Sequence, residues 1–258
     1  MEEIIKKLNA EMVVNQNVFT ISLFGANFAV SETIITMTII TIVMCVFALF
    51  FVRAKRFSQI PSKLQNIIEI FVEFINNFTK EQLGHYWRGF APYFGTILLF
   101  LIFANMISIF NFFPSKEFLV DILHIEAFHD LPDFQLKPPT KDINVAATLA
   151  LMSITLLLFA SIYLKGIKGF LKTFIHPSPI MLPFKILDYG IRPLTLTMRL
   201  FGNIFAAFVV MELLLAVFPF IAPGFASLYF DLFDGILQAY IFVFLTSIYL
   251  HENLEELE

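Results

Sequence analysis

The stretch that decides the fold reads LTLTMRLFGN over residues 194–203, and it lies in an almost uncharged run that continues to Leu228. A guanidinium at membrane depth costs about 2.5–3.5 kcal/mol on insertion scales, so we expect Arg199 to have a function. Arginine does not release its proton in proteins, and Arg199 is therefore predicted to act as a fixed positive charge. The sequence leaves open which anionic group lies opposite it.

The composition of the chain predicts a polytopic membrane protein. Hydrophobic residues make up 58% of its 258 residues, with 34 Phe and only 15% charged residues. A water-soluble globule of this length cannot bury so much apolar surface. The net charge of −4 and the lack of a basic patch argue against nucleic acid as a partner. Cys45 is the single cysteine, so neither a disulfide within the chain nor a thiolate metal site is expected.

The pattern of apolar runs predicts an all-α membrane protein with five transmembrane helices and one interfacial amphipathic helix. Residues 33–52 form an uncharged run, which at about 1.5 Å per residue matches a hydrocarbon core of about 30 Å. Residues 62–80 have apolar positions at helical spacing and charged residues on the other side, which is typical of a helix that lies along the interface. We interpret the chain as a single membrane domain, 1–258, with an outer N-terminal segment 1–32, spans 33–52, 92–113 and 143–164, and a helical hairpin 180–250.

The basic residues of the short loops predict the orientation. They follow the first span, at positions 53–63, and follow span 143–164, at positions 165–172, so both loops are expected to face the cytoplasm. The acidic loop 114–142 belongs outside. The N-terminus is therefore predicted to lie outside and the C-terminus in the cytoplasm.

The last two spans are treated as a helical hairpin that turns near residues 219–224. Residues equidistant from the turn lie at similar depth, which places Asn203 near the level of Gln238. Arg199 lies deeper, where the facing helix has no carboxylate. Asp188, on the same helix as Arg199, is about 16 Å away by helical rise and cannot pair with it directly. We therefore expect the counter-charge of Arg199 to belong to another subunit.

The acidic residues of the hairpin predict two aqueous pockets. Glu212 falls opposite Asp231, and such a carboxyl pair in a low-dielectric setting can serve as a proton acceptor reached from outside. Asp231, Asp234 and Gln238 share one face of the last helix, which is typical of the wall of a hydrophilic passage. On the cytoplasmic side, Asp188 is expected to line the second pocket.

Several motifs of the chain share one known pattern. They are MRLFGNIFA at 198–206, LQAYIF at 237–242, SIYL at 247–250, KDINV at 141–145 and LKGIKGF at 164–170. Together they resemble subunit a of the F-type rotary ATP synthase, of the bacterial type, over at least residues 92–250. The resemblance implies a stator subunit without catalytic residues or cofactors, in a bacterial plasma membrane. Its expected partners are the ring of c subunits, the b subunits of the peripheral stalk, other ATP synthase subunits and membrane lipid.

The resemblance also implies roles for individual residues. The last two helices are expected to be long and tilted along the ring, with Arg199 separating two offset half-channels and engaging the ring carboxylate. Asn203 and Gln238 are expected to line the ion path. The coupling ion, H⁺ or Na⁺, would come from outside, bind the ring and leave near Asp188, and the residues expected along its inward path are Asp142, Asp231, Glu212 and Gln238.

The chain departs from the family pattern at two places. The family commonly has Gly-Glu or Gly-His where this chain has Ala207 and Phe208, and Glu212, one helical turn further on, is the candidate substitute. Seven residues before Gln238, Asp231 stands where well-known members have His or Glu. Both changes bear on whether the ion is H⁺ or Na⁺.

Simpler structural explanations stay open for several of these residues. Asn203 suits a hydrogen bond between helices, and Glu212 suits a protonated carboxyl inside the bundle. Asp231 and Asp234 lie close enough to the outer turn to be solvated. Arg192 suits an anchor that snorkels to the interface.

Two other classes of function also stay open. A self-contained secondary transporter is the alternative, and it requires a partner for Arg199 within the chain. A membrane hydrolase has no supporting motif. In the outer loop, His124, Glu126 and His129 match no standard metal site, so no metal is expected.

Overall fold

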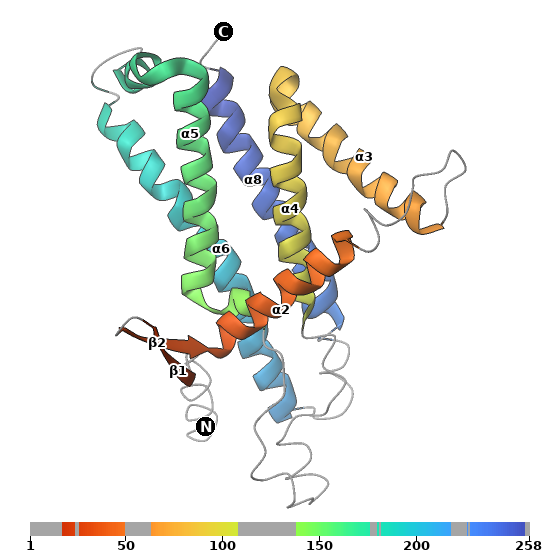
Figure 1. Cartoon of the computed structure of the whole chain (residues 1–258). Coiled ribbons are helices and arrows are strands. Elements are labelled where there is room, and N and C mark those ends of the chain that lie inside the picture. The colour runs from red at the N-terminus through yellow and green to blue at the C-terminus, as the bar shows by residue number, and fades with distance from the viewer. Residues whose placement is uncertain are drawn as a thin grey trace, which may run out of the picture.

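The computed structural model describes residues 17–23, 26–49, 63–107, 138–175, 182–217 and 228–255, together with Ile180 and Ala226. Within these residues the chain is mainly helical (Figure 1). The elements are β1 (Asn17–Leu23), β2 (Ala26–Ser31), α2 (Glu32–Phe47), α3 (Lys63–Leu83), the short turn η2 (Gly84–Tyr86), α4 (Trp87–Met106), the turn η6 (Pro139–Lys141), α5 (Ile143–Ile175), α6 (Leu182–Val217), the π-helical η8 (Leu228–Asp234) and α8 (Gly235–Glu255).

Four stretches of the described residues are long and apolar enough to cross a membrane: Gln65–Met106, Ile143–Phe170, Leu182–Met211 and Leu232–Leu254. They confirm the prediction of a multi-pass α-helical membrane protein. The first stretch is not one straight helix, because the chain reverses between α3 and α4 (Figure 1). The reversal lies at Gly84, whose φ of +52° is a value that side chains disfavour.

The first of the five predicted crossings, residues 33–52, stays a prediction. α2 has 16 residues, which span about 24 Å, less than the hydrocarbon core of about 30 Å. The predicted first span, 33–52, continues beyond α2 to residues that lie outside the described part of the chain. The predicted interfacial helix, 62–80, corresponds to α3, and its position at an interface is likewise untested.

The β1–β2 hairpin is an addition to the predicted all-α fold. The two strands pair antiparallel, from Asn17 opposite Ser31 to Leu23 opposite Ala26. The prediction for residues 1–32 is an outer N-terminal segment, with no strand named in it. The signal was present in the sequence, because apolar and polar residues alternate from Phe19 to Leu23, a period of two that favours a strand.

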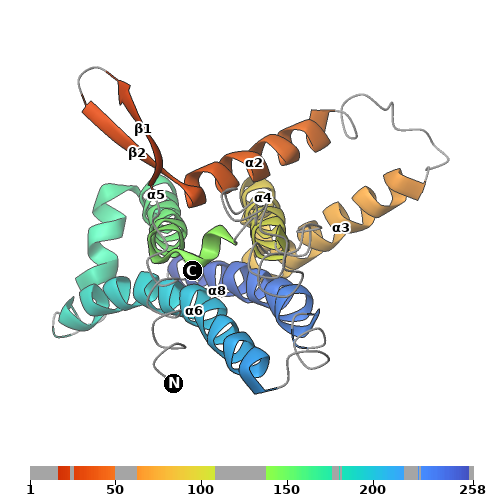
Figure 2. The same cartoon turned by 90° about the horizontal axis from the view of Figure 1, so that it is seen from below.

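Helix α8 lies at the centre of the bundle. Viewed from below, it lies between α6 on one side and α4 and α5 on the other (Figure 2). The core contains Phe94 and Leu101 of α4 and Phe242 of α8, each no more than 1% exposed. From α6, Leu196 and Leu200 join this core near the middle of the helix. The rest of α6 turns much of its surface away from the chain.

Helix α5 runs beyond its predicted end at residue 164. It contains Gly166 with φ 69° and ψ 165°, a non-helical conformation that breaks the helix axis. Beyond this break, the helix lies across the end of the bundle (Figure 1). The apolar span and the basic segment after it are therefore two differently directed parts of one element.

Gly235, the first residue of α8, lies directly against Asn105 of α4. A Cβ at this position would lie 3.1 Å from the Asn105 Cβ. Asn105 Nδ2 donates a hydrogen bond to the Gly235 carbonyl oxygen at 3.0 Å. The close contact between α4 and α8 thus requires a residue without a side chain at position 235.

Replacing Gly235 with Ala is expected to destabilise the bundle by about 1–3 kcal/mol, because the added methyl group overpacks against Asn105. Thermal unfolding of the detergent-solubilised protein, followed by circular dichroism, measures the effect. Gly89→Ala is the matched control, since a Cβ at Gly89 meets no atom within 4 Å. Equal unfolding temperatures for both variants would contradict the close contact.

Candidate functional site: the α6–α8 hairpin

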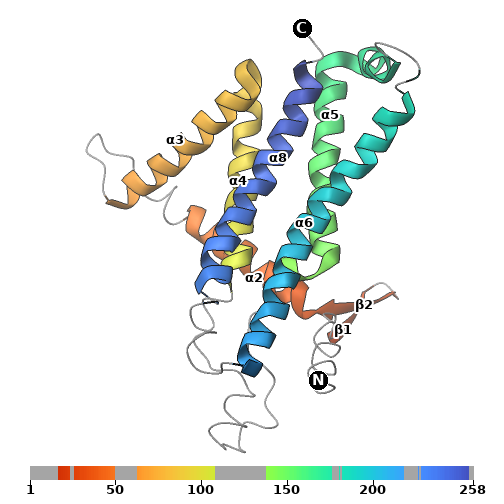
Figure 3. The same ribbon diagram turned by 180° about the vertical axis from the view of Figure 1, so that it is seen from behind.

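Helices α6 and α8 lie side by side and tilt in the same direction, and polar contacts fix their register (Figure 3). Asn203 Nδ2 donates to Gln238 Oε1 at 3.2 Å. Arg192, eleven residues before Asn203, donates from Nη1 to the carbonyl oxygen of Tyr249 at 3.4 Å, and Tyr249 lies eleven residues after Gln238. The equal spacing confirms the predicted level of Asn203 with Gln238.

Arg199 lies between these two contacts, four residues before Asn203. The residue four positions after Gln238 is Phe242, which is 1% exposed. Helix α8 has no acidic residue at positions 235–251. Arg199 is exposed, and it forms no ion pair or hydrogen bond with the side chains that the structure describes. The predicted lack of a carboxylate on α8 at this level is thus confirmed.

The surface of α6 around Arg199 is apolar and uncovered. Within the apolar 18-residue part of α6, only 18% is buried inside the chain. The corresponding shares for the other three candidate spans are 44%, 50% and 39%. The exposed apolar side chains of α6 include Ile191, Leu194, Met198, Val210 and Leu213. A cation on such a face is open to a partner outside the chain.

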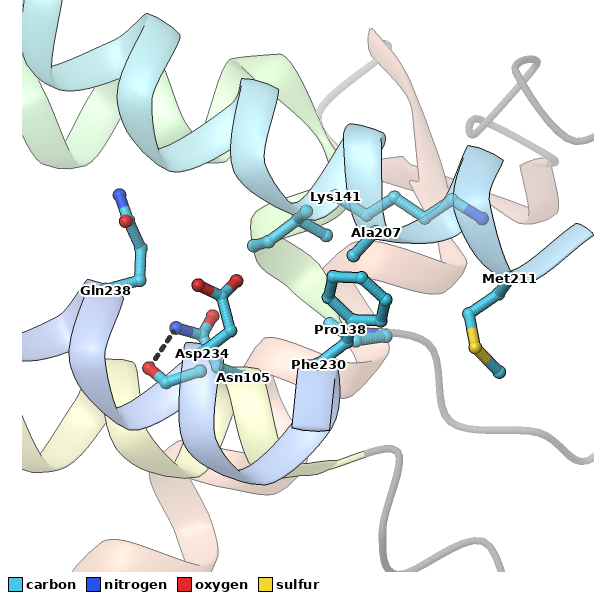
Figure 4. A pocket seen from close by; sticks show the side chains of 10 residues that line it. Asn105, Pro138, Lys141, Ala207, Met211, Phe230, Asp234 and Gln238 are labelled. Atoms are coloured by element: carbon cyan, nitrogen blue, oxygen red, sulfur yellow. Dashed lines mark hydrogen bonds between the residues drawn. The ribbon is translucent and has the colours of Figure 1, made fainter. Parts of the chain in front are cut away.

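A cavity of about 160 Å³ lies between α6 and the start of α8 (Figure 4). Asp234 and Gln238 lie on its wall, and both side chains point toward α6. Asn203 Nδ2 donates to Asp234 Oδ1 at 3.0 Å as well as to Gln238. Gln238 is 2% exposed, and its Nε2 has no acceptor among the described residues. The cavity thus combines a carboxylate with a buried amide donor, about one helical turn from the level of Arg199.

Comparison with known proteins assigns the chain to a family. The family model described as ATP synthase A chain matches residues 34–251. The chain belongs to this family. Over 227 residues it is 30% identical to "ATP synthase subunit a, sodium ion specific" of Propionigenium modestum, which covers 87% of this chain and 76% of that relative. The chain is therefore a non-catalytic, ion-translocating subunit in the membrane sector of an ATP synthase, with other subunits of that enzyme as partners.

The cavity bears on one of the two places at which this ATP synthase subunit is expected to depart from the family pattern. Ala207, which belongs to that place, lies on the cavity wall. Across the cavity, the carboxyl of Asp234 comes from the end of η8, where α8 begins. The side chains of Glu212 and Asp231 lie outside the described part of the structure, so their predicted pairing stays a prediction.

Asp142 has a structural role that our sequence analysis did not infer, although an Asp directly before an apolar helical run is a signal for an N-cap. Its Oδ1 accepts hydrogen bonds from the backbone N–H of Asn144 at 2.9 Å and from the Asn144 side chain at 3.0 Å. A side-chain oxygen one residue before the helix that accepts from its second N–H is an N-cap. Asp142 is 7% exposed and does not line the cavity, whereas its neighbour Lys141 does.

Asp188 is paired with a cation on its own helix. Arg192 Nε donates to Asp188 Oδ2 at 2.8 Å, and Arg192 Nη2 lies 2.7 Å from Glu252 Oε2 of α8. The interpretation of Arg192 as a snorkelling anchor stays a prediction, and the structure adds that its side chain is only 12% exposed and bridges two helices.

Asn105, which sequence reasoning missed, joins three elements. It is 5% exposed, and its Oδ1 accepts a hydrogen bond from Thr140 Oγ1 at 2.7 Å, while its Nδ2 binds the Gly235 carbonyl. α4, η6 and α8 therefore meet at this side chain, next to Asp234. The available signal was an amide in an otherwise apolar span, since such residues often link helices.

The outer-loop residues His124, Glu126 and His129 lie outside the described part of the chain. Among the described residues, no group of three or more His, Cys, Asp and Glu side chains is arranged to hold a metal ion.

Asn105→Ala is expected to destabilise the subunit by about 1–3 kcal/mol for each polar partner that it leaves unsatisfied, Thr140 and the Gly235 carbonyl. Thermal dissociation of the subunit from the purified complex measures this loss. Thr140→Val removes one of the two bonds and should show the smaller effect. A double variant no worse than Asn105→Ala would support the shared bond, whereas strictly additive losses would contradict it.

Proposed function

We propose that this chain is the stator subunit that carries the coupling ion to and from a rotating ring of c subunits through two offset half-channels. The observation that carries the proposal is the exposure of Arg199 on an uncovered face of α6, without a partner among the described side chains. Such a cation suits a carboxylate on another protein that approaches and leaves. Because Arg199 keeps its proton, it also separates the two half-channels without relaying protons itself.

The inward half-channel runs through the cavity beside α8. Asn203 connects Asp234 to Gln238 there, and such a linked set of polar side chains can relay a proton or replace part of the hydration of a cation. Glu212 and Asp231 extend this path toward the outer surface. Asp142 supports the path indirectly, because its carboxylate caps α5 next to Lys141 on the cavity wall.

The outward half-channel opens near Asp188. Its side chain is 50% exposed and lies at the end of α6 that is paired with the C-terminal end of α8. The N-terminus lies outside and the C-terminus in the cytoplasm of a bacterial cell, in whose plasma membrane b subunits of a peripheral stalk hold this stator. The exposed Lys168, just after the Gly166 break, supports the cytoplasmic position of this end.

The coupling ion is H⁺ or Na⁺, and the ring carboxylate selects between them. The name of the Propionigenium modestum relative makes Na⁺ the first ion to test. A self-contained secondary transporter is not favoured, since it requires a partner for Arg199 that the described part of the chain does not supply.

Arg199→Ala is expected to abolish coupled ATP synthesis while the complex still assembles, because the ring carboxylate loses its counter-charge. ATP synthesis by membrane vesicles under an imposed ion gradient measures the effect, with assembly checked on native gels. Met198→Ala, which removes the exposed neighbouring side chain without changing charge, is the control. Normal ATP synthesis by Arg199→Ala would contradict the proposed function.

Asp234→Asn is expected to slow ion flow about tenfold or more, because the amide keeps the shape of the side chain but cannot take up a proton or attract a cation. Passive ion conductance of vesicles stripped of the catalytic sector, measured with and without Na⁺, tests this. Glu212→Gln, measured in parallel, is expected to slow the flow as well. A carboxyl whose amide variant conducts normally is a packing residue and not part of the path.

A further inference from the structure

A charged cluster joins α6 and α8 on the side of Arg199 opposite to the cavity. Its centre is Arg192, which the ion path proposed above does not use. Arg192 Nε binds Asp188 of its own helix at 2.8 Å, Nη2 binds Glu252 of α8 at 2.7 Å, and Nη1 donates to the Tyr249 carbonyl oxygen at 3.4 Å. All three guanidinium nitrogens are therefore engaged.

The cluster is built around the guanidinium plane. The Arg192 guanidinium carbon lies 4.8 Å from the ring centroid of Tyr249 and 5.7 Å from that of Tyr189. The Arg192 side chain is 12% exposed, while its two carboxylate partners are each 50% exposed. A planar fork that pairs with carboxylates and packs against aromatic rings is a geometry that lysine does not reproduce.

A second contact supports the same junction. The Tyr189 hydroxyl donates a hydrogen bond to Asn253 Oδ1 of α8. Asn253 is 6% exposed, and its Nδ2 donates in turn to the Tyr249 carbonyl oxygen at 2.8 Å. Two neighbouring side chains of α6 are thus attached to one turn of α8.

The residue that follows Arg192 explains why α6 needs this attachment. Pro193 lies inside α6 and has no N–H, so the helix lacks the hydrogen bond that would end on the Tyr189 carbonyl. Prolines at such positions are the usual sites of helix kinks. The attached residues, Tyr189 and Arg192, lie directly before this weak point, and Arg199 lies six residues after it.

We propose that Arg192 is a positioning residue that clamps α6 to α8 across the Pro193 interruption and so fixes the height and direction of Arg199. The proposal rests on the proposed function of Arg199. The clamp lies seven residues from Arg199, about 10 Å by helical rise, and the Asn203 contacts lie four residues away on the other side, about 6 Å. With both attachments in place, α6 cannot slide or rotate beside α8 when the ring pulls on Arg199.

The first experiment compares coupling in complexes that carry Arg192→Gln, Arg192→Lys or Glu252→Gln. ATP hydrolysis and ATP-driven ion pumping are measured in vesicles, and both are divided by the amount of assembled complex. Arg192→Gln is expected to lower pumping about fivefold while hydrolysis continues, since the energies by which contacting residues are coupled correspond to factors of this size. Arg192→Lys and Glu252→Gln should give intermediate losses, because each keeps part of the cluster.

The matched control is Arg88→Gln, which removes a positive charge from α4 at the same end of the bundle (Figure 1). Arg88 is exposed and lies 5.6 Å from the ring centroid of Trp87, and α8 lies between α4 and α6 (Figure 2). Pumping by Arg88→Gln should equal that of the original complex. Equal losses in Arg88→Gln and Arg192→Gln would overturn the proposal, because a general loss of charge would then explain both.

The second experiment tests the connection with Pro193. Ala at position 193 restores the backbone hydrogen bond and stiffens α6, so Pro193→Ala is expected to recover most of the pumping lost in Arg192→Gln. A direct role of Arg192 in moving ions would not be rescued in this way, and absence of rescue would overturn the clamp. If Arg192→Gln does not assemble, Glu252→Gln with and without Pro193→Ala gives the same test.

These outcomes are separate from those for the proposed function. Loss of ATP synthesis in Arg199→Ala together with normal coupling in Arg192→Gln would reject the clamp and leave the stator function intact. Normal synthesis in Arg199→Ala would reject the stator function whatever the Arg192 variants do.

Discussion

The rest of this structure depends on one fixed positive charge, the guanidinium of Arg199. None of the described side chains of its own chain pairs with it. Helix α6 carries Arg199 on its uncovered side, while Leu196 and Leu200 join the core on another side. Apolar packing alone does not hold a helix at one height, because apolar contacts are non-directional. Directional contacts do so here, through Asn203 on one side of Arg199 and Arg192 on the other.

The sequence predicts those parts of the site that follow from the pairing of two helices joined by a turn. Two antiparallel helices joined by a turn must pair residues equidistant from it, and this rule alone is sufficient to predict that Asn203 lies beside Gln238. The same rule predicts that no carboxylate of α8 reaches Arg199. The amino-acid composition is also sufficient to predict a membrane protein, because this prediction does not require knowing which residues contact one another.

The residues that escaped prediction depend on which helices become neighbours. Asn105 matters because α4 lies against the start of α8, and no spacing within α4 encodes that contact. Arg192 resembles a membrane anchor in the sequence for the same reason, since Glu252 belongs to a distant part of the chain. The prediction missed the β1–β2 hairpin and the continuation of α5 beyond Gly166 for a different reason. In both places a short local pattern lies beside a long apolar run that dominates the interpretation of the sequence.

The exposure of Arg199 also has a consequence for how the enzyme is put together. An unassembled copy of this subunit bears the desolvation of that guanidinium alone, about 2.5–3.5 kcal/mol on insertion scales. In the proposed function, docking beside an acidic rotor removes this penalty, which corresponds to about two orders of magnitude in the association constant. The residue proposed to meet the rotor at each step of turnover would thus also favour the assembled state, so that biogenesis and rotation would draw on the same electrostatic attraction.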